Sequence, residues 1–341
     1  MPQQAPSALP PAVLLNARNA VIVHQSLYAV ARLGVADLLQ KGPRSAANLA
    51  RELKVNEDAL YRILRVLASQ GIFEENSDHS FRNTDISNFL RSDFPGSMRA
   101  LFIFWGSDYS FTSLGQIMRT LETGKCAPEL LSDNDSFEQL RRDPELARIF
   151  DDAMTTMSRS MAPAAAAAYD FTGWESLMDV GGGNGILLAE ILRAHPRLRG
   201  VLADQEHVLD RAREHKFLAG DLASRASMEP CNFFENIPSG CRAYIMKNII
   251  HDWDDERARL ILTNCRKAIA SNGVLLLVEL SVGEANVPSF GKFIDIAMLS
   301  LTGGRERTEA EYASLLASAG FRLNRVVPVN PHFGIIEAFP V

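Results

Sequence analysis

Short apolar runs alternate with helical segments along the second half of the chain, from Trp174 onward. Four of these runs, at residues 177–180, 201–204, 243–246 and 273–280, have the length and apolar character of strands. Residues 321–339, which are interrupted by two prolines and a glycine, predict a closing antiparallel pair of strands. Strands that alternate with helices are typical of a mostly parallel sheet covered by helices on both faces. The pattern therefore predicts an α/β fold for this half of the chain.

Residues 13–39 carry apolar side chains at intervals of three and four with little charge between them, which predicts helices. Val21, Leu27, Val30 and Leu33 belong to this pattern. Helices as apolar as these usually bury more than one face. Two arrangements would achieve this, namely a homodimer interface or packing within the chain.

Residues 45–84 predict the order helix, turn, helix, hairpin, with a capping residue at the start of each helix and a glycine after the second. This is the order of a winged helix, which raises DNA binding as a rival function. Arg62 and Arg65 could contact phosphates. However, Glu57 and Asp58 lie on the same helix and the whole chain is acidic, so we interpret this unit as a winged-helix fold with a structural role.

Residues 99–168 look mainly helical and hold much of the aromatic and thioether surface of the chain. Most of these side chains should belong to the core. Some could close over an aromatic ligand, because methionine adapts to irregular shapes. Trp105, Phe150 and Met154 are candidates for such a pocket, with core packing as the alternative for each.

Composition narrows the class of protein. The chain has 341 residues, of which 47% are apolar and 22% charged, and this is enough for two domains with a sizeable core. A net charge of −6 argues against a general nucleic-acid binder. The four cysteines have no metal-binding spacing, which favours reduced, buried thiols. No apolar run approaches the roughly 20 residues of a membrane helix, and the start lacks the basic region of a signal peptide, so we expect a cytoplasmic protein without membrane contact.

A glycine-rich turn follows the first predicted strand of the α/β half. The run Asp-Val-Gly-Gly-Gly-Asn-Gly occupies residues 179–185, and Asp204 ends the next apolar run. A turn of this kind at a helix start, with a carboxylate after the next strand, is typical of a nucleotide site, where the carboxylate holds ribose hydroxyls. A dinucleotide-binding fingerprint would require glycine at position 186, where this chain has Ile186. A P-loop would require a lysine after the turn, and no lysine directly follows it. The sequence thus favours a nucleoside ligand without a diphosphate.

Polar residues also cluster after the strand at 243–246, in the run Lys-Asn-Ile-Ile-His-Asp-Trp-Asp-Asp at 247–255. In open α/β sheets, ligands bind outside the carboxyl ends of the strands. We therefore expect His251 and the glycine turn to face the same crevice.

These motifs together identify a family. The chain resembles the plant-type and hydroxyindole-type O-methyltransferases and their bacterial relatives over nearly its full length. The resemblance rests on residues 179–185, on His-Asp-Trp-Asp-Asp at 251–255, on Leu-Val-Glu-Leu around Glu279, and on Gly-Gly-Arg-Glu-Arg-Thr at 303–308. It implies a Rossmann-like class I methyltransferase domain, preceded by a helical and winged-helix domain that dimerises. It also implies that His251 is the general base and that Glu279 and Glu306 flank and orient its ring.

The resemblance divides the chain into three parts. Residues 1–98 would form the dimerisation domain, residues 99–168 a helical connector that contributes to the substrate pocket, and residues 169–341 the catalytic domain that binds S-adenosylmethionine. The implied cofactor contacts are Asp179, Gly181, Gly183, Asp204, Gln205, Asn232, Phe233 and Lys247. Where the family usually has an aspartate for adenine, this chain has Asn232, which lacks the charge. Asp221 in Gly-Asp-Leu is the alternative, and we prefer Asn232.

The substrate pocket is predicted from family positions near the reacting oxygen. Asp252, Asp295 and Met298 match those family positions, and Trp105, Phe150, Met154 and Asn248 are further candidates. Core packing is an equally good explanation for each of them. Since the chain has no evident set of three carboxylates for magnesium, we expect metal-independent chemistry.

Histidine suits this chemistry because its unperturbed pKa, near 6.5, lets it accept a proton at neutral pH. We predict an S-adenosylmethionine-dependent O-methyltransferase that acts on a phenolic or other hydroxyl group of a small aromatic metabolite. The same scaffold can host N-methylation or cofactor-assisted hydroxylation or decarboxylation, which remain alternatives. A winged-helix regulator that senses a metabolite is the rival from another class.

Overall fold

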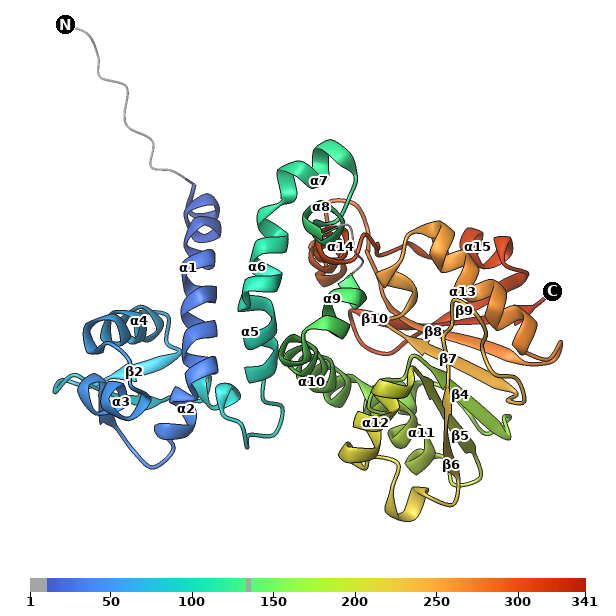
Figure 1. Cartoon of the computed structure of the whole chain (residues 1–341), viewed down its shortest axis with the longest axis horizontal. Coiled ribbons are helices and arrows are strands. Elements are labelled where there is room, and N and C mark those ends of the chain that lie inside the picture. Colours follow the sequence, from blue (N-terminus) through green and yellow to red (C-terminus); the bar gives the residue numbers. More distant parts are fainter. Residues whose placement is uncertain (1–10, 133–135) are drawn as a thin grey trace, which may run out of the picture. The chain divides into compact units, whose positions relative to one another are not determined.

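The computed structural model describes residues 11–132 and 136–341 and contains two compact units, Met1–Phe111 and Thr112–Val341 (Figure 1). The first is built from helices around one small sheet, and the second from a large sheet with helices on both faces. The α/β fold class predicted from the sequence is confirmed. The three-part division at residues 98 and 168 stays a prediction, because two compact units do not fix where functional domains begin.

The first unit contains the helix-helix-hairpin order that the sequence predicts. Ser45 and Asn56 each cap a helix by accepting a hydrogen bond from the backbone three residues later. The small sheet has the order β1-β3-β2 and is antiparallel. The elements of this unit are α1 Ala12–Leu33, α2 Val35–Leu38, β1 Arg44–Ser45, α3 Ala46–Leu53, α4 Glu57–Ser69, β2 Phe73–Glu75, β3 Ser80–Asn83, η1 Ser87–Leu90 and α5 Arg99–Gly106.

The long helix α1 buries only part of its apolar surface. Val30 and Ala31 near its carboxyl end are buried, and Val30 joins the core of the first unit. Val13, Val21 and Ile22 are 70%, 52% and 55% exposed. An exposed apolar stretch of this kind is unusual on a monomer and favours an interaction surface.

Residues 99–168 are mainly helical, as predicted. Beyond α5 they form α6 Asp108–Gly115, α7 Ile117–Thr123, α8 Ala127–Ser132, α9 Ser136–Arg142 and α10 Pro144–Ala168. Asp143 accepts hydrogen bonds from the first backbone N–H groups of α10, and Pro144 occupies the first helical position, where its missing N–H costs nothing. The result is a long helix that leads directly into the large sheet.

The large sheet has the strand order β6-β5-β4-β7-β8-β10-β9. Neighbours from β6 to β8 are parallel, and the final strand β10 is antiparallel to both of its neighbours, as predicted. The strands are β4 Ser176–Val180, β5 Arg199–Asp204, β6 Ala226–Pro230, β7 Ala243–Lys247, β8 Val274–Leu280, β9 Phe321–Pro328 and β10 Phe333–Pro340. Strand β6 was not predicted from the sequence. This edge strand, Ala-Ser-Met-Glu-Pro, is only partly buried and lacks an apolar run.

Helices cover both faces of this sheet (Figure 1). One core cluster joins α10, α11 Ile186–Ala194 and α12 Glu206–His215 to alternate strand residues such as Leu177 and Ile245. The other joins α13 Asp255–Ala268 and α15 Glu309–Ser318 to the intervening residues, such as Met178 and Met246. The remaining elements are η2 Gly220–Leu222, η3 Ile250–Asp252 and α14 Phe290–Leu301. Alternate burial of this kind fixes the register of each strand.

All four cysteines are free and buried, in agreement with the prediction of reduced thiols. Among the helices of the described residues, none is both long and apolar enough to cross a membrane.

Candidate active site

The glycine turn lies where β4 ends and α11 begins. Gly181 has φ +68°, and a Cβ atom placed on it would lie 2.5 Å from Ile249 Cδ1 and 3.6 Å from Phe233. The backbone conformation therefore disfavours a side chain at this position, and the Ile249 side chain would have to move to admit one. The turn brings three strand ends into contact at one edge of the sheet.

Asp204, at the end of β5, is held by the backbone of this edge. One carboxylate oxygen accepts a hydrogen bond from Gly183 N at 2.9 Å, and the other accepts one from Gln205 N at 2.7 Å. Burial raises the pKa of Asp204, while the two N–H donors oppose that rise. A carboxylate oxygen can accept more than one hydrogen bond, so a fixed Asp204 can also bind a pair of hydroxyl groups.

Asp179 and Lys247 end the neighbouring strands β4 and β7. Asp179 is 1% exposed, and neither of its carboxylate oxygens meets a hydrogen-bond donor within the described residues. Burial raises the pKa of Asp179 to about 7, and Lys247 opposes the rise. Burial likewise lowers the pKa of Lys247, against the attraction of Asp179, Glu279 and Asp252. A buried carboxyl without a partner suggests that a ligand supplies the missing donor.

The segment after β6 joins this edge through the bond from Cys231 N to Asp204 O, 2.8 Å long. Asn232 is exposed, and its amide bonds locally: the nitrogen donates to Glu235 at 2.9 Å and the oxygen accepts from Phe234 N at 3.2 Å. Phe233 lies near Gly181, because a Cβ atom placed on Gly181 would contact the Phe233 ring. The role of Asn232 in adenine binding stays a prediction.

Asp221, the alternative to Asn232, belongs to η2. That short helix leads into the amino end of β6, whereas Asn232 follows the carboxyl end of the same strand. The two residues therefore lie at opposite ends of β6. The cofactor turn and Asp204 lie at the carboxyl edge, which favours Asn232 and Phe233 over Asp221.

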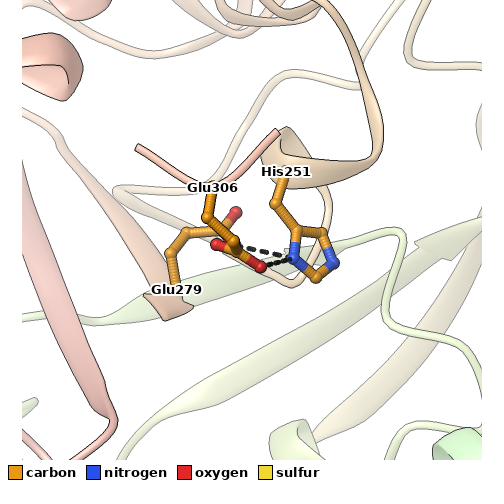
Figure 2. Close-up of side chains that lie close together, drawn as sticks. All are labelled: His251, Glu279 and Glu306. Carbon is orange, nitrogen blue, oxygen red and sulfur yellow. Dashed lines mark hydrogen bonds and ion pairs between the residues drawn. The ribbon is translucent and has the colours of Figure 1, made fainter. Parts of the chain in front are cut away.

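His251 lies in η3, directly after the carboxyl end of β7. Its ring is fixed at one nitrogen: Nδ1 lies 2.6 Å from Glu306 Oε1 and 4.0 Å from Glu279 Oε2 (Figure 2). Asp252 Oδ1 lies 3.6 Å from the other nitrogen, Nε2. Glu279 comes from β8 and accepts a hydrogen bond from Ile250 N at 3.0 Å. The sequence placed both glutamates beside the ring, and the structure brings all three side chains together.

Three carboxyl groups control the charge of the His251 ring. Burial lowers the pKa of His251, but Asp252, Glu306 and Glu279 outweigh burial and raise it to about 9. Burial also raises the pKa of Asp252 to about 6 and that of Glu279 to about 7, and the His251 cation opposes both shifts. The three carboxyl groups therefore favour the protonated ring in the free protein, and a nearby positive charge would favour loss of that proton.

The predicted substrate residues fall into different surroundings. Asp252 faces the ring, and Asn248, which has φ +53°, has a buried side-chain oxygen without a partner in the described chain. Asp295 in α14 accepts a hydrogen bond from Glu306 N at 2.8 Å, so it fixes the backbone at Glu306. Met298 is buried in the same helix.

The aromatic candidates lie in packed surroundings. The ring of Phe150 lies 6.4 Å from that of Phe137, edge to face, and Met154 is half-buried one turn further along α10. Trp105 belongs to α5 in the first unit, where its ring lies 5.4 Å from Phe104. Their roles in substrate binding stay predictions.

A cation site is the other chemistry that the His251 cluster could support, since ligand atoms of His251, Glu279 and Glu306 lie within 4.8 Å of one another. The short Nδ1 to Glu306 contact, however, uses the ring nitrogen that such a site would need. We interpret the cluster as an acid–base site, and the absence of a metal stays a prediction.

Three contributions to this edge were not predicted from the sequence. Asn184 donates a hydrogen bond to Thr155 Oγ1 in α10 at 2.7 Å, and Arg211 Nε lies 2.7 Å from Asp151 one turn earlier in α10. Arg307 is buried behind His251. Arg307 lies within the motif at 303–308, so the sequence could have indicated that it belongs to the site. No sequence pattern indicates the contacts of α10, because they depend on how distant elements pack.

Comparison with known proteins gives the family. Residues 127–322 match the profile of the O-methyltransferase domain, and residues 15–93 match that of the O-methyltransferase dimerisation domain. The chain belongs to the O-methyltransferase family. The winged-helix unit is thus the dimerisation domain of this family, as the sequence resemblance implied.

Two curated relatives show the range of acceptors within the family. Phenazine O-methyltransferase PhzM of Lysobacter antibioticus is 37% identical over 329 residues, which is 96% of each chain. The 8-amino-8-demethylriboflavin N,N-dimethyltransferase of Streptomyces davaonensis is 34% identical and aligned over 91% of this chain and 90% of its own. The chain is therefore a methyltransferase of a family that includes both O- and N-methyltransferases of aromatic natural products.

Solved structures agree with this assignment. LaPhzM matches with a TM-score of 0.93 at 37% identity, over 98% of this chain and 100% of its own. The O-methyltransferase NcsB1 from neocarzinostatin biosynthesis, solved with S-adenosylmethionine and 2-hydroxy-5-methyl naphthoic acid, matches with a TM-score of 0.85 at 29% identity, over 98% and 100%. The Rossmann-like fold and the S-adenosylmethionine cofactor predicted from the sequence are confirmed at the level of the family.

Proposed function

We propose that this protein transfers the methyl group of S-adenosylmethionine to a hydroxyl group of a small aromatic compound, with His251 as the general base. The observation that carries the proposal is the His251 ring, fixed through Nδ1 by Glu306 at 2.6 Å while Nε2 is left to accept a proton. A histidine held in this way by a carboxylate has one tautomer and a stabilised cation.

The reaction is an in-line displacement. The acceptor oxygen forms a bond to the methyl carbon, the bond from that carbon to the sulfonium breaks, and its electron pair returns to sulfur as a neutral thioether. The proton of the hydroxyl group passes to Nε2 of His251. The positive charge of the bound sulfonium would oppose the imidazolium, and this lowers the pKa of His251 when the cofactor is present.

The cofactor is proposed to lie along the carboxyl edge of the sheet. Asp204 would accept hydrogen bonds from the ribose, and Phe233 would pack against the nucleoside. Asp179, which is buried and has no donor at hydrogen-bond distance in the described chain, would hold the cationic end of the amino acid. Gly181 and Gly183 would line the same ligand.

The acceptor is proposed to approach His251 from the Nε2 side. Asp252 lies 3.6 Å from that atom, and Asn248 offers a buried oxygen that lacks a partner among the described residues. Both atoms accept hydrogen bonds, so they suit an aromatic compound with a further donor beside the reacting hydroxyl group.

N-methylation is the second candidate, favoured by the 34% identical dimethyltransferase that acts on an amino group. An aromatic amine can attack the methyl group as a neutral nucleophile and lose its proton afterwards. Its reaction would therefore depend less on His251 than that of a phenol.

The proposal is tested by an assay of methyl transfer from radiolabelled S-adenosylmethionine. The acceptors are pairs of aromatic compounds that differ only in carrying a hydroxyl or an amino group. We expect transfer to the hydroxyl compound. We also expect His251→Ala to reduce the rate by about 10²- to 10⁴-fold with cofactor binding retained. His332→Ala, which removes an exposed histidine of the same unit, is the matched control. Transfer to the amine alone would assign N-methylation, and a protein that does not bind the cofactor would contradict the proposal altogether.

The protein is further proposed to act as a homodimer, since it carries the dimerisation domain of the family and exposes apolar side chains on α1. A cytoplasmic location and the absence of nucleic-acid partners stay predictions.

A further inference from the structure

Arg307 has one of the largest fully buried side chains in the described part of the protein, at 2% exposure. It follows Glu306 directly in the segment between α14 and α15. A buried guanidinium is costly unless its N–H groups are paired, so its partners indicate what it does.

Four of the five hydrogen bonds of Arg307 reach residues 250–255, which contain His251. Nη1 donates to Ile250 O at 3.1 Å, and Nη2 donates to Trp253 O at 2.9 Å, so the two carbonyls lie on either side of His251 in the sequence. Nε and Nη2 donate to Asp255 Oδ1 at 3.0 and 2.7 Å, and Nη1 also donates to Arg305 O at 3.3 Å. The side chain thus ties η3 and the start of α13 to the segment that carries Glu306.

The backbones of the two segments also touch. Arg305 N donates to His251 O at 2.9 Å. A Cβ atom on Gly304 would overlap His251 O and the carbonyl of Asp252, so only glycine permits this approach. Glu306 is therefore held from both sides, by the contacts of residues 304–305 before it and by Arg307 after it.

We propose that Arg307 is a positioning residue that sets the hydrogen bond between Glu306 and His251. The proposal rests on the proposed function, in which His251 is the general base. A planar fork is suited to this task, because one guanidinium reaches both carbonyls at once, whereas a lysine ammonium cannot match that geometry.

A purely structural role is the competing explanation, since Arg307 also pairs with Asp255 at the start of α13. The two roles differ in their effect on the His251 ring. If Arg307 sets the bond to Glu306, its replacement lengthens that bond and lowers the pKa of His251 toward its ordinary value. A structural residue would change the free energy of unfolding and leave the ring unaffected.

Several other titratable groups lie near the ring or its partners, and none of them is substituted in the proposed variants. Asp252 of η3 and Glu279 of β8 lie beside His251, and Lys247 of β7 interacts with both carboxyl groups. Tyr312 of α15 lies near Glu279 and Glu306. A change in the titration of His251 would therefore report on the displaced Glu306.

The test compares the full-length wild type with Arg307→Lys and Asp255→Asn, the second of which weakens the same anchor from its exposed end. The His251 ring is titrated by NMR in protein labelled at histidine, with the signal assigned by its loss in His251→Ala. We expect a lower His251 pKa in both variants. We also expect kcat to fall by roughly 10- to 100-fold in Arg307→Lys, less than the loss of the base itself, with the cofactor Kd unchanged.

Arg259→Lys is the matched control, because Arg259 is an exposed arginine of α13 that lines the same surface hollow as Arg307. Folded variants with an unchanged His251 titration and kcat within twofold of wild type would overturn the proposal. Failure of both variants to fold would also overturn it, by assigning a stabilising role. If the wild type methylates no acceptor, the proposed function fails, and the titration still decides the role of Arg307.

Discussion

From the distances around His251, we propose a different role for each of its three carboxyl groups. Glu306 is hydrogen-bonded to Nδ1, Glu279 lies 4.0 Å from the same atom and binds Ile250 N, and Asp252 lies on the Nε2 side. Only Glu306 can fix the tautomer of the ring directly. Glu279 holds the loop, and Asp252 faces the position proposed for the acceptor.

Substitution of the two glutamates should therefore differ in effect. We expect Glu306→Gln to lower kcat by about 10²-fold or more, because the ring loses its oriented carboxylate, and Glu279→Gln to lower it roughly tenfold. Single-turnover rates at saturating cofactor would measure both. Glu256→Gln, which changes an exposed carboxylate of α13, is the control. Equal losses for both variants would contradict the distinction.

The raised pKa of His251 gives the reaction a pH dependence. The proposed base is active only when the ring is neutral. The kcat/KM for S-adenosylmethionine, which reports on the protein before the cofactor binds, should therefore rise with pH until His251 loses its proton at a pKa of about 9. In Glu306→Gln the rise should move to lower pH, because one carboxylate that holds the proton is gone. The profile should be measured with an acceptor whose hydroxyl group ionises outside this range. A profile that is flat from neutral pH upward would be inconsistent with this assignment.

At the scale of elements, the carboxyl edge of the sheet explains why motifs scattered along the chain form one site. The turn after β4, the ends of β5 and β7, and the segment after β6 meet there, and Gly181 lies beside Ile249, Phe233 and Ala203. The backbone forms this edge, and the order of the strands determines which side chains lie next to one another there.

Gly181→Ala tests that close approach. A residue with a side chain at φ +68° costs roughly 1–2 kcal/mol, and the new Cβ would lie 2.5 Å from Ile249 Cδ1. We expect the free turn to relax away from this strained conformation, so that its restoration on binding lowers the affinity for S-adenosylmethionine by up to about tenfold, as measured by titration calorimetry, because 1.4 kcal/mol corresponds to a factor of ten. Gly173→Ala is the control, because a Cβ there would meet open space. Equal affinities for the two variants would argue against a tight turn at the cofactor.

At the scale of the whole molecule, α1 keeps apolar side chains exposed over its first turns while its carboxyl end joins the core of the first unit. This unit is the part of the chain that matches the family's dimerisation domain. A homodimer would cover those side chains.

Ile22→Asp should therefore weaken the dimer, because a charge would be buried at an interface without a partner. We expect a shift from dimer to monomer in sedimentation velocity, with the unit still folded by circular dichroism. Arg62→Glu, an exposed change on α4, should leave the dimer intact. A wild type that is monomeric at micromolar concentration would contradict the proposed dimer.

The sequence by itself determined the local structure: strand and helix periodicity, helix caps, the glycine turn and the histidine after a strand end. These features depend on neighbouring residues and on allowed backbone angles, so a linear pattern contains them. The edge strand β6 was not predicted, because it pairs with one neighbouring strand only and has no apolar run.

Only the tertiary structure decided how distant groups meet. His251 and Glu306 are 55 residues apart, and their contact depends on the strand order and on the packing of two loops. The same packing turned Asp295, a predicted substrate residue, toward the backbone of Glu306, and it buried Arg307 behind His251. Each of these contacts joins segments from different elements, and a one-dimensional pattern does not specify the geometry between them.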